Sequence, residues 1–347
     1  GRVAVDAHEV NAALVEAVNA LGSMSFPEDG GVGEGEPVGA VDFLAEGGDI
    51  ANRMELDFGR QVQTATQSFE QFRADYIDGL RLHAGDGNRT PVYAVPGNHD
   101  VSNAVGFHRP MTPLRDPGSI LAIYNLFMRP SVPKTAETFN YAHDRVLYAR
   151  DVAGLHVLFV GVWPDSVART WMEADLSRVS ATTPVVIVAH DQVDGEAKHF
   201  LNPRAAHDIN ATDLFENLLA DEFVGGDATA VAVTEQRDFA AFLRRHPNVT
   251  AYFHGNSNWN QFYDWVGPDH DALLHVFRVD SPMKGRFSAA DETRLSFQIA
   301  TVNMASRLLT VREVLWNATR APGLPTWGAS TTVALWPRPV AANTSEP

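Results

Sequence analysis

Short apolar runs alternate along the chain with segments whose apolar residues recur at helical spacing. Most of the runs are continuously apolar, which is typical of strands that are buried on both faces. Strands that alternate with helices form a sheet covered by helices on both sides. The sequence therefore predicts an α/β fold, with strands at residues 38–45, 91–96, 155–162, 184–189 and 249–254.

The intervening segments have the three- and four-residue spacing of amphipathic helices. They predict helices at residues 9–21, 61–80, 171–176, 213–220 and 235–245, and a short helix near residues 120–128. Residues 146–149 are predicted to pair with 155–162 as neighbouring strands. From His275 onward the pattern becomes β-rich, with strands predicted at residues 276–279, 294–301 and 308–311.

The length of 347 residues is sufficient for one large sandwich domain. We expect this domain to span residues 1–314, with a cap-like insertion near residues 104–150. That insertion is irregular and contains proline, as expected of a loop that covers a site. Residues 315–347 are rich in Pro, Ala and Thr and are expected to form a C-terminal extension.

Composition limits the chemistry that is available. The chain has no cysteine, so a metal ion would have to be held by His, Asp, Glu or Asn side chains. Its formal net charge of −16 argues against a nucleic-acid partner, which needs a basic surface. The longest apolar runs are far shorter than the roughly 18 residues of a membrane span, so no span is predicted.

Polar clusters stand at the carboxyl ends of four apolar runs, where open α/β sheets bind their ligands. The first is Gly47-Gly48-Asp49, and the second is the run Gly97-Asn98-His99-Asp100. The third is His190, directly after residues 184–189. The fourth begins at the end of the run 249–254 and contains His254, Asn256 and Asn258.

In order and rough spacing, these clusters resemble the motifs of the calcineurin-like metallophosphoesterases, of the purple acid phosphatase and phosphodiesterase type. The motifs of that family are D-x-H, G-D, G-N-H-D/E, a His after an apolar strand, and G-H-x-H. The resemblance spans about residues 38–258, and residues 171–176 also resemble the W-L-x-x-D-L helix of the family. It implies a four-layer α/β/β/α sandwich of two mixed sheets that hydrolyses phosphoesters with a metal-bound hydroxide.

The resemblance also implies roles for individual residues. Asp49 would bridge two divalent metal ions, and Asn98 and His190 would complete the shell of the second ion. His99 would protonate the leaving oxygen as a general acid, oriented by Asp100. The implied partner is a small phosphoester substrate, and Mn, Fe, Zn, Mg and Ca are all compatible with these ligands.

Each of these residues also has a purely structural interpretation. A Gly-Asp pair after a strand is often a turn with a helix cap, which would account for Asp49. A single buried histidine such as His190 is usually a hydrogen-bonded core residue, and Asn98 alone would be a turn residue. The combination of the clusters is what favours a metal site.

The chain departs from the family at the G-H-x-H motif. Asn256 and Asn258 replace both histidines, and an amide oxygen is a weaker ligand than imidazole for Zn or Fe. The site would then favour Mg, Mn or Ca, or hold one ion fewer. His254, just before the glycine, could compensate in part if its side chain turned inward.

The opening D-x-H motif is the second departure. Asp6 and His8 have the required letters, but they lead directly into the helix predicted at residues 9–21, and Asp6 is a suitable N-cap for it. The alternative, which we favour, is that the first strand and its D-x-H motif precede Gly1. The full-length protein would then hold the two metal ions.

Two functions remain open at this stage. One is the metal-dependent phosphomonoesterase or phosphodiesterase that the resemblance implies. The other is a protein of the same fold with a weakened or inactive metal site that binds a ligand or a partner. The replaced histidines and the displaced D-x-H motif favour the second function. Neither the cellular compartment nor the oligomeric state follows from the sequence.

Overall fold

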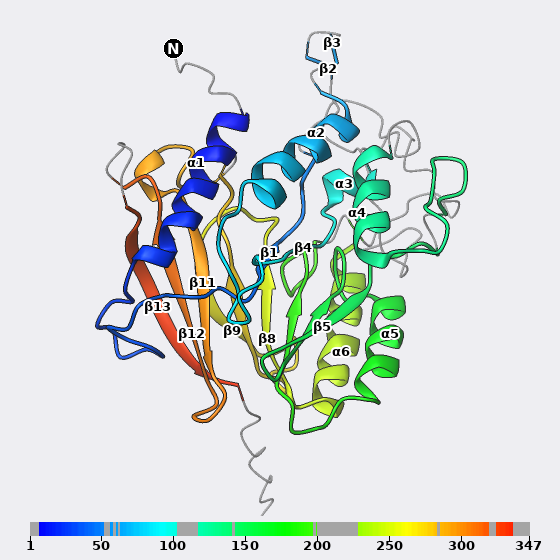
Figure 1. The fold of residues 1–347 in the computed structure, drawn as a ribbon. Helices are drawn as coiled ribbons and strands as arrows, with labels where there is room; N and C mark the ends of the chain where they lie inside the picture. The colour runs from blue at the N-terminus through cyan, green and yellow to red at the C-terminus, as the bar shows by residue number, and fades with distance from the viewer. Residues whose placement is uncertain are drawn as a thin grey trace, which may run out of the picture.

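The chain has a mixed α/β fold with several sheets and helices, seen in a computed structural model (Figure 1). Asp6 and the helix predicted at residues 213–220 lie outside the residues that the structure describes, as does much of the predicted insertion. The described residues are 7–51, 56–57, 60–61, 63–102, 117–140, 143–196, 199, 228–282, 285–318 and 324–335.

The largest sheet has six strands, and its four central strands are parallel. The two edge strands, β5 and β9, run antiparallel to their neighbours. The strand order is β5 (Tyr148–Val152), β6 (Leu155–Phe159), β7 (Val185–Val188), β8 (Val249–His254), β10 (Leu274–Arg278) and β9 (Gln261–Trp265). The carboxyl ends of the parallel strands therefore share one edge, as the sequence analysis requires.

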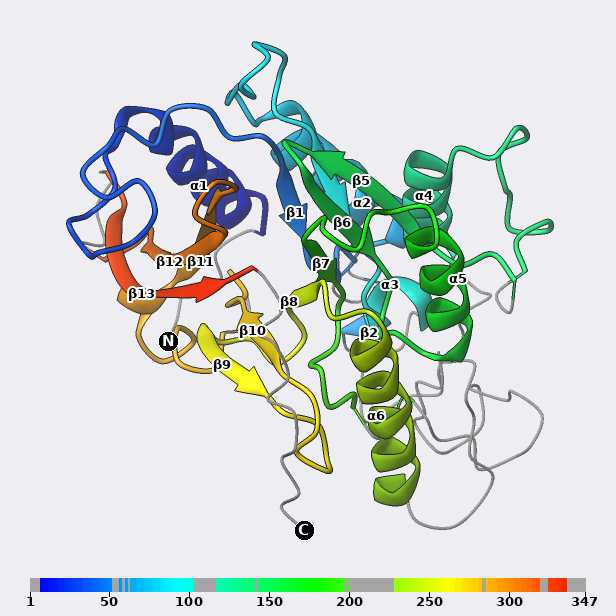
Figure 2. The same ribbon diagram turned by 90° about the horizontal axis from the view of Figure 1, so that it is seen from below.

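Helices α5 (Ser166–Leu176) and α6 (Ala228–Arg245) lie on one side of this sheet (Figure 2). Helix α5 begins where the Asp165 side chain caps the main-chain N–H of Ala168. Buried side chains of the helices, including Met172 and Phe239, pack in one core with strand residues such as Tyr252. This core supports the strands that carry the candidate site.

The other face of the six-stranded sheet packs against a second, antiparallel sheet. Its strands are β11 (Ser296–Asn303), β12 (Leu308–Leu315) and β13 (Thr326–Ala334). Phe277 and Val186 of the large sheet meet Leu309 and Val311 of the second sheet in a buried cluster. Helix α1 (Ala7–Ala20) packs near Val314 in a further cluster, on the side away from α5 and α6 (Figure 2).

Strands β1 (Leu44–Glu46) and β4 (Val92–Ala94) form a short parallel pair. The hydroxyl of Tyr148 in β5 donates to the Ala94 carbonyl at 2.8 Å, so this pair is fixed to the edge of the large sheet. Helix α2 (Ala65–Phe72) starts after a capping box of Thr64 and Gln67 and continues as a π-helix, Arg73–Asp78.

The remaining elements are short. Helix α3 (Asn98–Ser102) follows β4, and α4 (Gly118–Met128) packs against α2 and α3. The minor pieces are β2 (Leu56–Asp57), β3 (Arg60–Gln61) and the 3₁₀ turns Leu21–Ser23 and Glu292–Arg294. None of the helices in the described residues is both long and apolar enough to cross a bilayer.

Most predicted elements are confirmed, including the helix at residues 9–21, the strand at 184–189 and the strand at 249–254. The strand predicted at residues 38–45 is wrong in extent, because only Leu44–Glu46 pairs with β4. Upstream, main-chain groups bond to loops instead, as when the Val41 N–H donates to the His83 carbonyl. Strands β9 and β13 were not predicted, and the division at residue 314 stays a prediction.

Candidate metal centre

The ends of three strands bring three of the predicted polar clusters together. Asp49 follows β1, Asn98 opens α3 directly after β4, and His190 follows β7. The Nε2 atom of His190 lies 3.0 Å from Asn98 Oδ1 and 3.4 Å from Asp49 Oδ1. Residues that are far apart in the sequence thus form one small cluster.

The protonation of His190 makes this cluster unusual. Its Nδ1 atom lies 2.6 Å from the Gly47 carbonyl oxygen, which can only accept, so Nδ1 carries a proton. In the neutral ring Nε2 then offers a lone pair, and this lone pair faces the acceptor oxygens of Asn98 and Asp49. A cation beside these three acceptor atoms, or a second proton on His190, would offset the repulsion between the lone pair of His190 and the two oxygens.

The spacing and burial fit a cation. Ligands about 2.1 Å from one octahedral ion lie about 3 Å apart, close to the separations in this cluster. Asn98 and His190 are 2% and 1% exposed, so a cation at this position would be shielded from bulk water. Carboxylate, amide oxygen and imidazole are all established ligands of divalent metal ions. We therefore regard Asp49, Asn98 and His190 as able to hold one divalent cation.

His99 lies against the same carboxylate. Its Nε2 atom is 3.6 Å from Asp49 Oδ2, and its main-chain N–H donates to Asp49 Oδ1 at 3.1 Å. The ring is therefore beside the candidate cation position without being one of its three converging ligands. The role in proton transfer predicted for His99 stays a prediction.

Asp100 has different partners from those expected. Its carboxylate accepts from the main-chain N–H groups of Ile50, Ala51 and Gly97, at 3.1, 2.7 and 2.9 Å. It also accepts from the Ser119 hydroxyl at 2.6 Å. Asp100 thus ties the turn after β1 to the turn after β4. The role predicted for Asp100 in orienting the His99 ring stays a prediction.

Glu46 is a member of this site that the sequence analysis missed. Burial raises the pKa of the Glu46 carboxyl well above its usual value, and the negative charges of Asp100 and Asp49 raise it further. Burial and Asp49 likewise raise the pKa of Asp100. Three carboxyl groups therefore share one region of negative potential, which favours a bound cation. The signal for Glu46 was its place next to Gly47-Gly48-Asp49, at the carboxyl end of a predicted strand.

Glycines allow the two turns to approach each other. A Cβ on Gly97 would lie 2.2 Å from Asp49 Oδ1 and 2.7 Å from His190 Cε1. A Cβ on Gly48, whose φ is +97°, would lie 2.6 Å from both Gly97 N and His190 Nδ1. Asp49 itself has a φ of 63°, which is uncommon for a residue with a side chain and is held by these contacts.

A cavity of about 160 Å³ opens beside these residues. Glu46, Asp49 and His190 line it, together with residues of α1, α2 and the loops after β8 and β10. The cavity gives a small ligand access to Asp49. It therefore places a possible substrate next to the candidate cation position.

Asn256 and Asn258 also line this cavity, in a turn where their φ angles are 55° and 60°. Asparagine tolerates this left-handed conformation better than most residues, which is a structural reason for both positions. The Asn256 amide group donates to the Asp191 carboxylate and, at 3.2 Å, to Glu196. The structure thus turns the Asn256 NH₂ group toward Asp191, and the metal-ligand role predicted for both asparagines stays a prediction.

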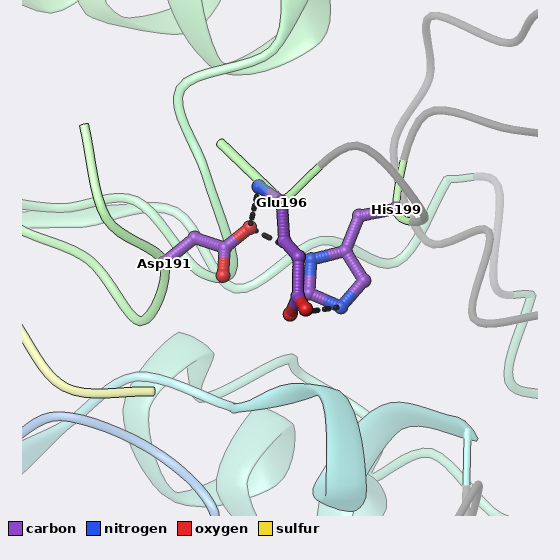
Figure 3. Close-up of side chains that lie close together, drawn as sticks. All are labelled: Asp191, Glu196 and His199. Carbon is purple, nitrogen blue, oxygen red and sulfur yellow. Dashed lines mark hydrogen bonds and ion pairs between the residues drawn. The ribbon is translucent and has the colours of Figure 1, made fainter. Parts of the chain in front are cut away.

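Asp191, Glu196 and His199 form a second buried group that could hold a metal ion (Figure 3). The ring atom His199 Nδ1 lies 2.7 Å from Asp191 Oδ2, and Nε2 lies 3.8 Å from Glu196 Oε2. Burial alone would raise the pKa of Asp191, but the neighbouring His199 offsets it and the pKa is lowered. The sequence analysis did not find this group, because Glu196 and His199 follow no strand.

Two of the remaining predicted ligands, His254 and His8, have other contacts in the structure. The His254 ring contacts the Gly255 carbonyl at 3.0 Å and the Tyr263 hydroxyl at 3.2 Å. Burial, with Arg278 nearby, lowers the pKa of His254 to about 3, so the ring is neutral. His8 is in α1, where its ring contacts Asp75 at 2.6 Å. Asp6 is outside the described residues, so the D-x-H prediction as a whole is not tested.

No protein-family model matches the chain, and no curated protein matches its sequence significantly. Among solved structures, the chain is similar to the crystal structure of phosphopantetheinyl hydrolase (PptH) from Mycobacterium tuberculosis. The TM-score is 0.35 and the identity is 14%, over 83% of this chain and 90% of that chain. A likeness of this size carries no argument, so the function is inferred from the site.

Proposed function

We propose that this chain is a metal-dependent phosphoester hydrolase with a four-layer α/β/β/α fold of the metallophosphoesterase type. The observation that carries the proposal is the convergence of Asp49, Asn98 and His190 at 3.0 and 3.4 Å beside an open cavity. The two packed sheets would be the inner layers, and α5 and α6 on one side and α1 on the other would be the outer layers. The substrate would be a small phosphoester rather than a nucleic acid.

The protein residues have distinct parts in this reaction. A divalent cation at Asp49, Asn98 and His190 would neutralise phosphoryl charge and lower the pKa of a water molecule. His99 would hold a proton on Nε2 and deliver it to the leaving oxygen. Asp100 would keep the two turns in register through its four hydrogen bonds, and Gly48 and Gly97 would leave room for the close approach.

Hydrolysis of p-nitrophenyl phosphate and of its bis ester tests this function. The protein would first be stripped of metal and then assayed with Mn²⁺, Mg²⁺ or Zn²⁺. We expect hydrolysis that requires an added cation, a loss of about 100-fold or more in His99→Ala, and complete loss in Asp49→Asn. His83→Ala is a matched control, because His83 lies in a loop outside the site. Full activity in a His99→Ala plus Asp49→Asn double variant would contradict the proposal.

The second function, a ligand- or partner-binding protein of the same fold, is favoured by one observation. The Asn256 amide group is bound to Asp191 and Glu196, and imidazole is absent from both motif positions of that turn. The same assay separates the two functions. Cation binding that is accompanied by no hydrolysis of either ester would support the binding protein and exclude the hydrolase.

A further inference from the structure

Arg278 is a buried cation without a carboxylate partner. It is at the carboxyl end of β10, is 8% exposed, and forms no salt bridge with any residue that the structure describes. Its Nη1 atom donates to Gln261 Oε1 at 2.8 Å and the guanidinium also interacts with the Tyr263 hydroxyl, whereas the Nε atom has no hydrogen-bond partner. A buried charge left in this state is costly unless a counter-charge compensates it.

A second buried arginine shows the contrast. Arg312 in β12 is 1% exposed, and its guanidinium makes two hydrogen bonds of 2.8 Å to the Asp29 carboxylate. It also donates to the Val32 carbonyl at 3.1 Å. The same fold thus pairs one buried guanidinium with a carboxylate and leaves the other without one among the described residues. Burial accordingly lowers the pKa of Arg278, although an arginine remains charged in water.

Aromatic rings and further guanidinium groups surround Arg278. Its Cζ atom is 3.9 Å from the centroid of the Trp259 ring, and the Cζ of Arg286 is 4.8 Å from the same centroid. Arg294 in turn lies 4.6 Å from the Phe287 ring. Arg286 and Arg294 are exposed and, like Arg278, form no salt bridge within the described part of the chain. Three like charges gather here although the whole chain carries a net charge of −16.

This group of arginines is next, along the chain, to residues that line the cavity. Trp259 directly follows Asn258, and Arg278 directly precedes Val279; Asn258 and Val279 both line the cavity. The main-chain N–H of Arg286 donates to the Asn258 carbonyl at 2.6 Å. Asp194 acts on Arg278, and Arg294 acts on Asp280, through space and without a salt bridge between them. An anion at the arginines would therefore be close to a ligand in the cavity.

We infer that Arg278 and Arg286 form a binding site for a phosphate group, one that the substrate carries in addition to the phosphoester that is hydrolysed. A guanidinium binds phosphate oxygens through paired N–H donors, and the unpartnered Nε of Arg278 supplies such a donor. Trp259 holds both guanidiniums against its ring. That the bound phosphate belongs to a substrate of this protein rests on the proposed function, whereas the binding of phosphate at the arginines does not.

Direct binding and a substrate comparison test this inference. Inorganic phosphate would be titrated by calorimetry into metal-free protein at low salt, where we expect one equivalent to bind. Arg286→Ala and Arg278→Met should each weaken this binding about tenfold or more, since each removes charge-assisted hydrogen bonds. Arg286 is exposed, so its variant is expected to fold normally even if Arg278→Met does not.

Two control variants show whether the loss of phosphate binding is specific to Arg278 and Arg286. Arg150→Gln removes a guanidinium that also lies on a ring, 4.9 Å from Tyr148, but at the opposite edge of the same sheet. Asp49→Asn removes the candidate cation ligand. Both variants should bind inorganic phosphate as the parent protein does. Equal phosphate binding by the parent, Arg286→Ala and Arg278→Met, or none by the parent, would overturn the inference.

The substrate arm uses fructose 1,6-bisphosphate and fructose 6-phosphate, which differ by one phosphate group. We expect kcat/KM with Mn²⁺ to be about tenfold higher for the bisphosphate, and this preference to disappear in Arg286→Ala. Hydrolysis of both sugars without this preference would contradict a second phosphate-binding site for substrates, while the proposed hydrolase function would still stand. Phosphate binding that depends on Arg286, in a protein without hydrolysis, would support the subsite and contradict the proposed function.

Discussion

The close approach of the turns after β1 and β4 depends on single atoms. Gly97 has no side chain, and the space that a Cβ would need is occupied by Asp49 Oδ1 at 2.2 Å and Asp49 N at 2.4 Å. These neighbours are a main-chain atom and a ligand atom, so neither can move away without disturbing the site. The candidate centre is therefore sensitive to one methyl group.

Gly97→Ala should accordingly weaken binding of Mn²⁺ by more than the 10- to 100-fold that is typical when an outer partner of a metal ligand is lost. The measurement is the free Mn²⁺ signal in an electron paramagnetic resonance titration. Gly85→Ala is the control, because the nearest atom to its Cβ would be 3.6 Å away. Equal affinity in the two variants would show that the two turns do not form the cation site.

At the scale of elements, β13 belongs to the folded structure although it lies in the segment expected to be an extension. It pairs with β12 along its length, and Leu335 directly after it is 1% exposed, packed in the cluster of Leu309 and Val311. This segment therefore helps to hold the two sheets together.

Leu335→Ala should lower the free energy of unfolding by about 2–5 kcal/mol, since it removes buried methyl groups and leaves a cavity. Leu324→Ala is the matched control, because Leu324 is 63% exposed, and its effect should stay within about 0.5 kcal/mol. Urea unfolding of both variants measures the difference. A Leu335→Ala protein as stable as the control would show that β13 contributes little to the fold.

The ion pair of Arg312 and Asp29 joins the loop at residues 27–37 to β12. Arg312 lowers the pKa of Asp29 to about 2, from a usual value of 3.8. Because the folded-state pKa is the lower one, the pair stabilises the protein above about pH 4, and this contribution is lost as the pH falls toward 2.

Asp29→Ala should therefore destabilise the protein at pH 7 by about 3 kcal/mol, since it leaves the buried Arg312 without a counter-charge. The variant should also lose less stability than the parent between pH 4 and pH 2. Thermal unfolding of both proteins as a function of pH measures this. Parallel stability curves over that interval would contradict the assignment.

The sequence predicted many elements because their signals are local. Periodicity located α1 and α4, and continuous apolar runs located β7 and β8. The strand ends then located Asp49, Asn98, His99 and His190. What failed depends on contacts that no local pattern contains. Residues 38–43 bond to loops, and the His199 ring contacts the Asp191 carboxylate, which lies eight residues earlier in the chain. Arg278 was missed because lack of a counter-charge is visible only in three dimensions.

At the scale of the whole molecule, the candidate centre connects separate parts of the fold. Asp49 and Asn98 follow the two-stranded pair β1–β4, whereas His190 follows β7 of the six-stranded sheet. A cation shared by these residues would link the two-stranded sheet of β1 and β4 to the six-stranded sheet. It would also offset the mutual repulsion of Glu46, Asp49 and Asp100, which adds to the effect of burial in raising the pKa of Glu46 and of Asp100.

A cation that binds only the folded state stabilises it by mass action. At a free Mn²⁺ concentration of about 100 times Kd, the free energy of unfolding should rise by about 2.7 kcal/mol. Thermal unfolding with and without Mn²⁺ measures this rise, and the effect should grow with the logarithm of the Mn²⁺ concentration. An unchanged unfolding temperature at saturating Mn²⁺ would contradict a cation that links the β1–β4 pair to the six-stranded sheet.

The central claim is that Asp49, Asn98 and His190 hold a divalent cation, and calorimetric titration of the metal-free protein with Mn²⁺ tests it most directly. We predict that the parent protein and Asp42→Asn, which removes a nearby exposed carboxylate, bind at least one equivalent with the same affinity. Asp49→Asn should lose that equivalent. Absence of binding to the parent protein, or undiminished binding to Asp49→Asn, would contradict the claim.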